Sequence, residues 1–377
     1  MESFFLWKNV LFRGREKIDR LEIEKQKRRM NMKKRLWTKL AACALAGTMA
    51  ITGLTGCKSS DKKDSDSVDT VRIGTQEMPN DEGIAKAENY LEEKMGVKVK
   101  LVKFDSGKDI NNALKANSID FGLEGSTSTA LALSTGIDVK LIWIHEVLGD
   151  IESLAVRKKD NIKSIADLKG KTIAVPFATT SHYCLLRYLE SQGMSESDVK
   201  LLDMDTNSAY AAWKRGDIDA AWIWQPALQS VLDDGGEILV SNGDAAKEGY
   251  MTANVEVVSS DFAEKHPDLV KKYIEAMQEA RKLYSDDEDK AVSALAGQLG
   301  LKENEVKTQI SGSEWVSAKD QISDEYLGTS DKVGKMADNL LDTAKFLKDQ
   351  KNITSVPDKS TFENAMAPEY IKSVLGK

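Results

Sequence analysis

The chain of 377 residues is poor in cysteine, histidine and proline, with three, three and six residues of these types. Three cysteines cannot form the framework of a small disulfide-stapled protein. No apolar run reaches the roughly 18 residues that a membrane-spanning helix needs, which excludes a protein with several spans. The contents of 41% hydrophobic and 30% charged residues are typical of a globular protein. At about 150 residues per domain, the length predicts two or three domains.

Catalytic arrangements are also missing. His145, His182 and His266 are the only histidines, and no two of them have the spacing of a metal-binding pair. The Gly-x-Ser-x-Gly motif of serine hydrolases does not occur. Cys184 stands beside two leucines in an expected helix, where a small buried residue is the simpler interpretation. We therefore expect no enzymatic activity, no metal and no cofactor.

An uncharged stretch at 40–54 follows four basic residues within 33–39. A basic patch ahead of about 7–15 apolar residues predicts a secretory signal peptide. The stretch ends in the sequence LTGC at 54–57, which resembles the lipobox of bacterial lipoproteins, and the polar segment that follows is too hydrophilic to pack. We predict a lipoprotein signal peptide at 32–56, a lipidated Cys57 and a tether at 57–70.

Residues 1–31 precede this signal and are interpreted as the result of an early start codon, since Met30 and Met32 both offer later starts. Residues 1–56 carry 13 Lys and Arg against 5 Asp and Glu. The remaining 321 residues therefore carry 40 Lys and Arg against 55 Asp and Glu, a net charge of −15. Such an acidic exported protein is a poor candidate for binding nucleic acid.

From residue 70 on, strand and helix patterns alternate, which predicts a parallel-rich α/β fold. We expect two α/β lobes, with lobe 1 at 71–156 and 255–377, including helices at its C-terminal end, and lobe 2 at 157–254. The chain should cross between the lobes near 156–160 and 251–256. Strands are expected at 71–76, 97–104, 121–124, 139–145, 153–157, 171–176, 199–204, 220–224, 237–240 and 255–259. Apolar residues at helical spacing predict a helix at 83–95.

Ligands of open α/β sheets bind beyond the carboxyl ends of the strands. The candidate loops are therefore 76–81, 124–129, 145–152, 176–183, 224–227 and 251–254. Gln76 and Asn254 are candidate ligand contacts at two of these strand ends.

The loop 176–183 leads from a strand into a helix and is rich in hydroxyl groups. Free N–H groups at a helix N-terminus attract an anion, and the side chains of Thr179, Thr180, Ser181, His182 and Tyr183 could add donors. Capping of the helix by Thr180 or Ser181 explains the same residues without a ligand.

A second corner, at 125–129, has the sequence GSTST. Its glycine allows close approach of a ligand, and Ser126 and Thr127 offer further donors, although Ser126 could also simply cap the helix at 126–134. The two corners, one from each lobe, would converge on a common anion. Neither contains a Gly-Lys-Ser/Thr phosphate loop, so a nucleoside triphosphate is not indicated.

Trp224 directly precedes a helix and could form a wall for an apolar part of the ligand, whereas Trp222 is interpreted as a core residue. A cationic group of the ligand could be held by an aromatic face or by a carboxylate. Glu152, Glu146 and Asp150 are the candidate carboxylates.

Several segments spread from about residue 71 to 285 resemble the substrate-binding lipoproteins of ABC importers for taurine, sulfonates and nitrate, most closely the taurine branch. The matching segments are 103–107, 125–126, 176–177, 180, 182–183, 185–186, 211–219, 226–228 and 261–267. The resemblance implies a type II periplasmic binding protein fold whose two lobes close on a small sulfonate. It also implies an extracytoplasmic, lipid-anchored location and an ABC permease with its ATPase as partners. We expect a monomer.

The resemblance places Ser126, Glu152, Thr180, His182 and Tyr183 at the ligand cleft. A sulfonate has three acceptor oxygens, which suit neutral donors, while the ammonium of taurine requires a carboxylate.

The chain departs from the taurine branch at two positions. It has Gln225 where that branch has Asp, and Asn254 where a closely similar protein would have Asp. An alkanesulfonate or nitrate is therefore an alternative ligand. An enzyme on the same fold, as in thiamine-pyrimidine or menaquinone synthesis, and a sensory lipoprotein are the alternative functions.

Overall fold

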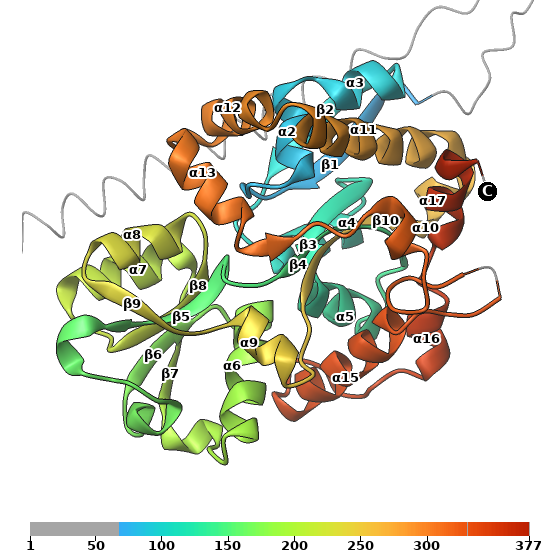
Figure 1. Ribbon diagram of the computed structural model, residues 1–377. Helices are drawn as coiled ribbons and strands as arrows, with labels where there is room; N and C mark the ends of the chain where they lie inside the picture. Colours follow the sequence, from blue (N-terminus) through green and yellow to red (C-terminus); the bar gives the residue numbers. More distant parts are fainter. Residues whose placement is uncertain (1–67, 330, 377) are drawn as a thin grey trace, which may run out of the picture. The chain divides into compact units, whose positions relative to one another are not determined.

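The computed structural model describes residues 68–329 and 331–376 (Figure 1). The predicted extension at 1–31, the signal peptide and Cys57 lie outside these residues. None of the helices in the described part of the chain combines the length and the hydrophobicity needed to cross a bilayer.

Lobe 1 is built on a six-stranded sheet with the order β11-β4-β10-β3-β1-β2. β1 is parallel to β2 and β3, whereas β10 returns antiparallel between β3 and β4. The return of β10 to the sheet of lobe 1 was expected from the sequence. The strands of this sheet are β1 (Thr70–Thr75), β2 (Lys98–Lys103), β3 (Phe121–Gly125), β4 (Val139–Leu148), β10 (Ala253–Ser259) and β11 (Ser313–Glu314).

Lobe 2 is built on a five-stranded sheet with the order β7-β6-β8-β5-β9. Its strands are β5 (Glu152–Arg157), β6 (Thr172–Val175), β7 (Lys200–Asp203), β8 (Ala220–Trp224) and β9 (Gly236–Ser241). β5 (Glu152–Arg157) pairs with β8 and β9, so it belongs to lobe 2 and the first crossing lies at 149–151. The prediction that lobe 1 extends to residue 156 was therefore wrong for this strand.

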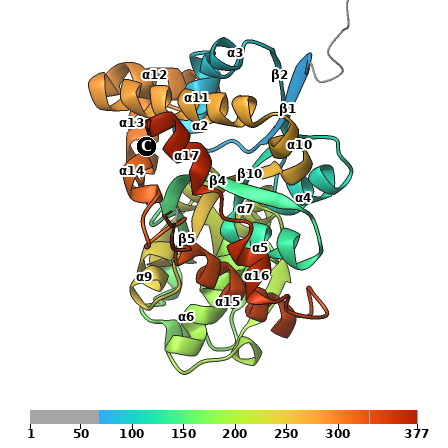
Figure 2. The same cartoon turned by 90° about the vertical axis from the view of Figure 1, so that its right-hand side faces the viewer.

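Helices cover both faces of each sheet (Figures 1 and 2). Those of lobe 2 are α6 (Thr180–Ser191), α7 (Thr206–Arg215), α8 (Ala227–Asp233) and α9 (Asn242–Lys247), with 3-10 turns at Lys158–Asp160, Ile165–Leu168 and Glu196–Asp198. Those of lobe 1 before the crossing are α2 (Asp81–Ala87), α3 (Tyr90–Met95), α4 (Gly107–Lys115) and α5 (Ser126–Ser134). The C-terminal helices are α10 (Ser260–Lys265), α11 (Pro267–Asp286), α12 (Glu288–Leu299), α13 (Glu303–Ile310), α14 (Ala318–Gln321), α15 (Met336–Asp349), α16 (Lys359–Glu363) and α17 (Pro368–Leu375).

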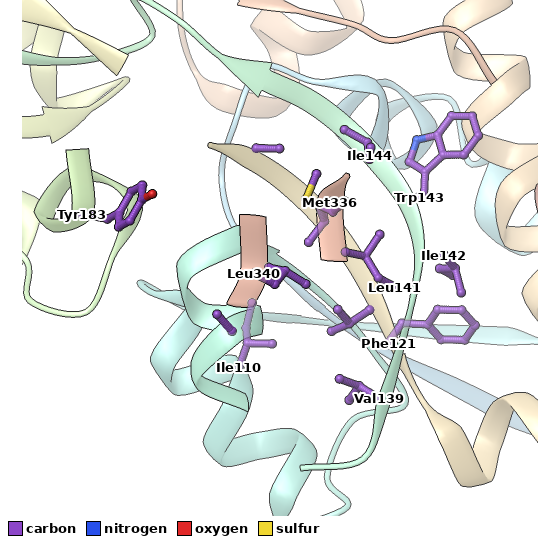
Figure 3. Close-up of a cluster of buried hydrophobic side chains, with 14 of the residues drawn as sticks. Ile110, Phe121, Val139, Leu141, Ile142, Trp143, Ile144, Tyr183, Met336 and Leu340 are labelled. Carbon is purple, nitrogen blue, oxygen red and sulfur yellow. The ribbon is translucent and has the colours of Figure 1, made fainter. Parts of the chain in front are cut away.

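Alternation along the strands of lobe 2 divides its apolar residues between two clusters. Ala221 and Ile223 of β8 pack with Trp213 of α7, whereas Trp222 belongs to the large cluster that also contains Tyr183 of α6. This large cluster extends through lobe 1, where Met336 and Leu340 of α15 gather with Leu141 of β4 (Figure 3). Trp143, Trp213 and Trp222 are fully buried, as expected for packing residues.

Two local features differ from the expected pattern. The helix expected at 83–95 is divided into α2 and α3 because Asn89 adopts a left-handed conformation, with φ of 61°. Ser126 does not cap α5, since Gly125 is the N-cap and the Ser126 hydroxyl accepts a hydrogen bond from the Ala253 N–H at 3.3 Å. Its role is to join α5 to β10.

The helix α15 packs against α5 of lobe 1 and contacts α6 of lobe 2 through side chains (Figure 2). The Phe346 ring packs edge-on against Tyr183 of α6, with 5.3 Å between the ring centroids. The Tyr183 hydroxyl donates to Asp342 at 3.1 Å, and the Asn339 amide donates to the Met251 carbonyl at 2.8 Å, next to the second crossing. The C-terminal part of the chain therefore joins the two lobes along one side.

A buried ionic cluster fixes the start of α2 to β4 and α11. Asp81 contacts the Nδ1 atom of His145 at 2.5 Å and the Nε atom of Arg281 at 2.6 Å, and it also accepts from the Trp143 indole N–H. The other ring nitrogen of His145 lies 3.1 Å from Glu256. Burial opposes both charged forms, but Arg281 and His145 lower the pKa of Asp81 to about 2, and Asp81 raises the pKa of His145 to about 10.

Candidate functional site

A narrow cavity of about 30 Å³ lies between the two lobes. Residues from strand ends and helix starts of both lobes line it. They are Gln76, Met78, Gly107, Gly125, Ser128, Leu148, Ile151, Glu152, Thr179, Thr180, Trp224, Gln225 and Asn254. None of these described residues is Lys, Arg or His, so the cavity wall carries no cationic side chain.

Three helices begin at this cavity: α4, α5 and α6. The first-turn N–H groups of a helix have no partner within the helix, and the helix dipole adds a partial positive charge at this end. Gly125, the N-cap of α5, has no side chain to satisfy these groups. The uncapped start of α5, next to the start of α4, is therefore suited to an anion without a cationic side chain.

Glycine makes the convergence of these helix starts possible. A Cβ atom at Gly107 would lie 2.4 Å from the Oγ atom of Ser128, and one at Gly125 would lie 3.0 Å from the Cγ2 atom of Thr180. Both distances are too short for any residue with a side chain to fit without movement of its neighbour. Gly107 thus lets α4 approach α5, and Gly125 lets lobe 1 approach lobe 2.

The start of α6 already holds an anion of the protein itself. Thr180 donates to both carboxylate oxygens of Glu152 at 2.8 and 2.9 Å, and the Ser181 hydroxyl also donates to Glu152. Thr179, rather than Thr180 or Ser181, is the N-cap, and its hydroxyl accepts from the His182 N–H. The hydroxyl groups that were expected to bind an anionic ligand are therefore directed at Glu152.

Glu152 is 2% exposed and has no cationic partner among the described residues. Burial raises its pKa to about 7, although the hydrogen bonds from Ser181 and Thr180 act in the opposite direction. A carboxylate at a helix start that lacks a counter-ion provides a site for a cationic group of a ligand. The cavity is thus suited to an anion on the α4–α5 side and to a cation beside Glu152.

Glu146, a second candidate carboxylate, lies behind the cavity wall. Its Oε1 atom accepts from the Asn254 amide at 2.6 Å, and burial raises its pKa to about 7. Asn254 itself lines the cavity. Glu146 therefore reaches the ligand space only through Asn254, and Asp150 does not line the cavity.

The structure brings most of the predicted site residues together at this cavity. Gln76, Glu152, Thr179, Thr180, Trp224, Gln225 and Asn254 line it, whereas Ser126, Thr127, His182 and Tyr183 do not.

His182 is directed away from the cavity, into the contact between α6 and α15. Its ring stacks on Phe177 at 4.5 Å between centroids and meets Phe346 edge-on. Burial lowers its pKa to about 4. Both His182 and Tyr183 thus hold α15 against lobe 2, because the first turn of α6 contacts Phe346 and Asp342.

Sequence reasoning missed five lining residues, namely Met78, Gly107, Ser128, Leu148 and Ile151. A signal for Gly107 was present, since Ser106 caps α4 and the segment 103–107 was among those that carry the family resemblance. Leu148 and Ile151 lie in the candidate loop 145–152 and flank the first crossing, which was expected about seven residues later in the chain. Met78 and Ser128 lie in loops that were already considered.

A wider cavity of about 390 Å³ continues outward past Gln76 and Trp224. It lies between α13 of lobe 1 and the helices α7 and α8 of lobe 2, which face each other in Figure 1. Its polar lining includes Thr206, Asn207, Gln229, Asp233 and Glu305.

The comparisons with known proteins agree with this architecture. Residues 83–309 match the family model described as NMT1/THI5 like. The taurine-binding periplasmic protein of Escherichia coli is 33% identical over 279 residues, which cover 72% of this chain and 84% of that protein.

Two solved structures share the fold. The periplasmic aliphatic sulphonate binding protein SsuA from Escherichia coli superposes with a TM-score of 0.66 at 23% identity, over 81% of this chain and 99% of that one. The alkanesulfonate-binding protein SsuA from Xanthomonas axonopodis pv. citri, bound to MOPS, gives a TM-score of 0.63 at 24% identity, over 79% and 98% of the two chains. The predicted periplasmic binding protein fold with two α/β lobes is confirmed.

Proposed function

The chain belongs to the NMT1/THI5-like family, and we propose that it is a solute-binding protein that captures taurine or a related small sulfonate for an ABC importer. One observation carries the proposal: the uncapped start of α5 and a buried carboxylate line the same cavity between the lobes. The names of the relatives, a taurine-binding protein and a sulphonate-binding protein, support it. It is a proposal for binding, not for catalysis.

The sulfonate group is assigned to the starts of α4 and α5, beside Gly107, Gly125 and Ser128. A sulfonate is a permanent anion whose three oxygens accept hydrogen bonds, so backbone N–H groups stabilise it without a buried cation. The short hydrocarbon part of the ligand lies against Trp224, Leu148 and Ile151. Its other end then reaches Glu152.

We also propose that the protein is exported as a lipoprotein and that its lipid on Cys57 holds it at the outer surface of the cell membrane as a monomer. The basic patch, the uncharged stretch and the LTGC sequence support export and lipidation. The permease and the ATPase of the importer are its partners. Mass spectrometry of the membrane fraction should find a lipidated N-terminal Cys57, and an unmodified or uncleaved N-terminus would contradict the anchor.

Titration calorimetry of the purified protein with taurine, 1-propanesulfonate, nitrate and glutamate tests the ligand class. We expect micromolar or tighter binding of at least one sulfonate and no heat with glutamate. Binding of nitrate alone would place the ligand among the small inorganic anions. No heat with either sulfonate would contradict the proposal for the ligand.

Replacing Gly107 with alanine should weaken sulfonate binding at least tenfold. The added Cβ atom would lie 2.4 Å from Oγ and 2.7 Å from Cβ of Ser128, so α4 and α5 must separate where they hold the anion. Such overpacking also costs about 1–3 kcal/mol of stability. Calorimetry measures the affinity, and urea unfolding measures the stability.

The matched control is Gly297→Ala in α12, where an added Cβ atom has no neighbour within 4 Å. This variant should bind as the parent does and gain about 0.5–1 kcal/mol, because alanine favours a helix over glycine. Equal affinities of the two variants would remove Gly107 from the anion site.

A further inference from the structure

Two side-chain amides in the cavity wall have their orientation fixed by groups behind the wall. The Asn254 amide nitrogen donates to Oε1 of Glu146 at 2.6 Å, and the Gln76 amide nitrogen donates to the Leu123 carbonyl at 3.0 Å. Both lining side chains are buried, at 6% exposure each. Because an amide has its donors on nitrogen and its acceptors on oxygen, these bonds leave the oxygen of each side chain for the ligand.

Gln225 is oriented the opposite way. Its Oε1 atom accepts from the backbone N–H of Gln229 at 3.1 Å, which leaves its Nε2 donor for the cavity. A carboxylate at this position would repel an anion, whereas the amide can donate to it. The wall of the cavity is therefore divided into donors, at Gln225 and the helix starts, and acceptors.

Three side chains of the wall offer amide or carboxylate oxygens as acceptors: Gln76 through Oε1, Asn254 through Oδ1 and Glu152 through its carboxylate. A primary ammonium has three N–H donors and one positive charge, which match three acceptors of which one is anionic. A hydroxyl group has one donor, and a quaternary ammonium has none. Quaternary ammonium ions are held by several aromatic faces, but Trp224 is the one aromatic side chain among the described residues of the wall.

We propose that this site selects sulfonates that carry an unsubstituted primary ammonium and discriminates against their N-methylated forms. This inference rests on the proposed function, because it assigns the cationic end of the same ligand. Glu146 is a positioning residue in this scheme: it never touches the ligand but keeps the Asn254 oxygen turned toward it. The selectivity thus comes from hydrogen bonds made behind the wall as well as from the wall itself.

The test compares taurine with its N-methyl, N,N-dimethyl and N,N,N-trimethyl derivatives by calorimetry at pH 8. All four ligands keep the sulfonate and the positive charge, and each methyl group removes one N–H donor. We expect the affinity to fall by about tenfold or more with each methyl group. If taurine and the trimethyl derivative bind equally well, the proposed selectivity is wrong while the proposed function stands. If none of the four ligands binds, taurine is not the ligand, and the proposed function is contradicted before the selectivity is tested.

Variants identify the residues responsible. Asn254→Ala should weaken the binding of taurine at least tenfold. It should weaken the binding of N-methyltaurine much less, because the methyl group can occupy the space left by the amide. Ser128→Ala, at the α4–α5 side of the cavity, should change the affinities of all four ligands by the same factor. If Asn254→Ala also lowers them uniformly, Asn254 does not hold an N–H group.

Glu146→Gln keeps the size of the side chain but lets it donate to Asn254, so the orientation of the Asn254 amide is no longer fixed. We expect the affinity for taurine to fall at least fivefold. The affinity for 1-propanesulfonate, which has no ammonium, should be unchanged. An equal loss for both ligands would mean that Glu146 acts on the structure alone. Circular dichroism and melting curves confirm that the variant is folded.

Discussion

Replacing Glu152 with glutamine should weaken taurine binding at least tenfold and leave 1-propanesulfonate bound as tightly as before or more tightly. The carboxylate is 2% exposed and has hydrogen bonds from Thr180 and Ser181 but no cationic partner among the described residues. A charge-assisted hydrogen bond to the ligand ammonium contributes about 1.5–3 kcal/mol, and about 1.4 kcal/mol corresponds to a factor of ten. An alkanesulfonate has no such bond to lose. Calorimetry with both ligands measures this difference.

The pH dependence provides an independent check of the same residue. The pKa of Glu152 is raised to about 7 by burial in the ligand-free protein, and only the ionised form attracts an ammonium. Below pH 7 taurine must displace a proton, so its affinity should fall by up to tenfold per pH unit. The affinity of 1-propanesulfonate should show the opposite trend or none.

In the Glu152→Gln variant, the decrease in taurine affinity between pH 7 and pH 5 should largely disappear. Glu146, whose pKa is also raised to about 7, remains in this variant and serves as an internal control. The Asp150→Asn variant is the matched control, because Asp150 lies two residues away and does not line the cavity. A taurine affinity unchanged in Glu152→Gln would place the ammonium elsewhere.

Replacing Arg281 with glutamine should destabilise the protein by about 3–5 kcal/mol, because it leaves the buried Asp81 carboxylate without its main cationic partner. Arg281 contacts Asp81 at 2.6 Å and donates to the carbonyls of Ile144 and His145 at 2.7 Å each. Its guanidinium also lies 4.6 Å from the Trp143 ring centroid. The free energy of unfolding in urea measures the effect.

Lys282→Gln, the next residue along α11, provides the matched control. Its ammonium forms an exposed i, i+4 pair with Asp286, and pairs of this kind contribute about 0.3–0.5 kcal/mol. A loss for Arg281→Gln no larger than that of Lys282→Gln would show that the ionic cluster does not stabilise the fold. Since the cluster fixes the end of β4, a loss of ligand affinity should accompany the loss of stability.

All strands except the two-residue β11 could be predicted from the sequence, because alternation and apolar runs are local signals. β8 and its turn to α8, or the return of β10 to lobe 1, follow from such patterns. The sheet to which Glu152–Arg157 belongs is not a local property, since it depends on pairing with β8 and β9 about 70 residues later. The crossing was therefore placed too late, although the strand itself was recognised.

The site shows the same division. A loop rich in hydroxyl groups before a helix could be recognised at 176–183, but the partner of those groups could not. Glu152 lies 28 residues from Thr180 in the chain, and it fills the anion site that the loop alone predicts. His182 was assigned to the ligand because it lies in this loop and in a segment that resembles the family, whereas its burial against Phe346 depends on a helix more than 150 residues away. Local chemistry identified the residues, and tertiary contacts decided what they bind.

The position of α15 determines how the ligand reaches the cavity. This helix packs on α5 and contacts α6 through Phe346 and Asp342, while Asn339 holds the second crossing, so these contacts resist separation of the lobes along that side. On the other side, α13 faces α7 and α8 across the wider cavity. We therefore expect the lobes to open on the side of the wider cavity, opposite α15. Taurine would pass Trp224 and Gln76 on its way in, and the same two residues would be the last to release it to the importer.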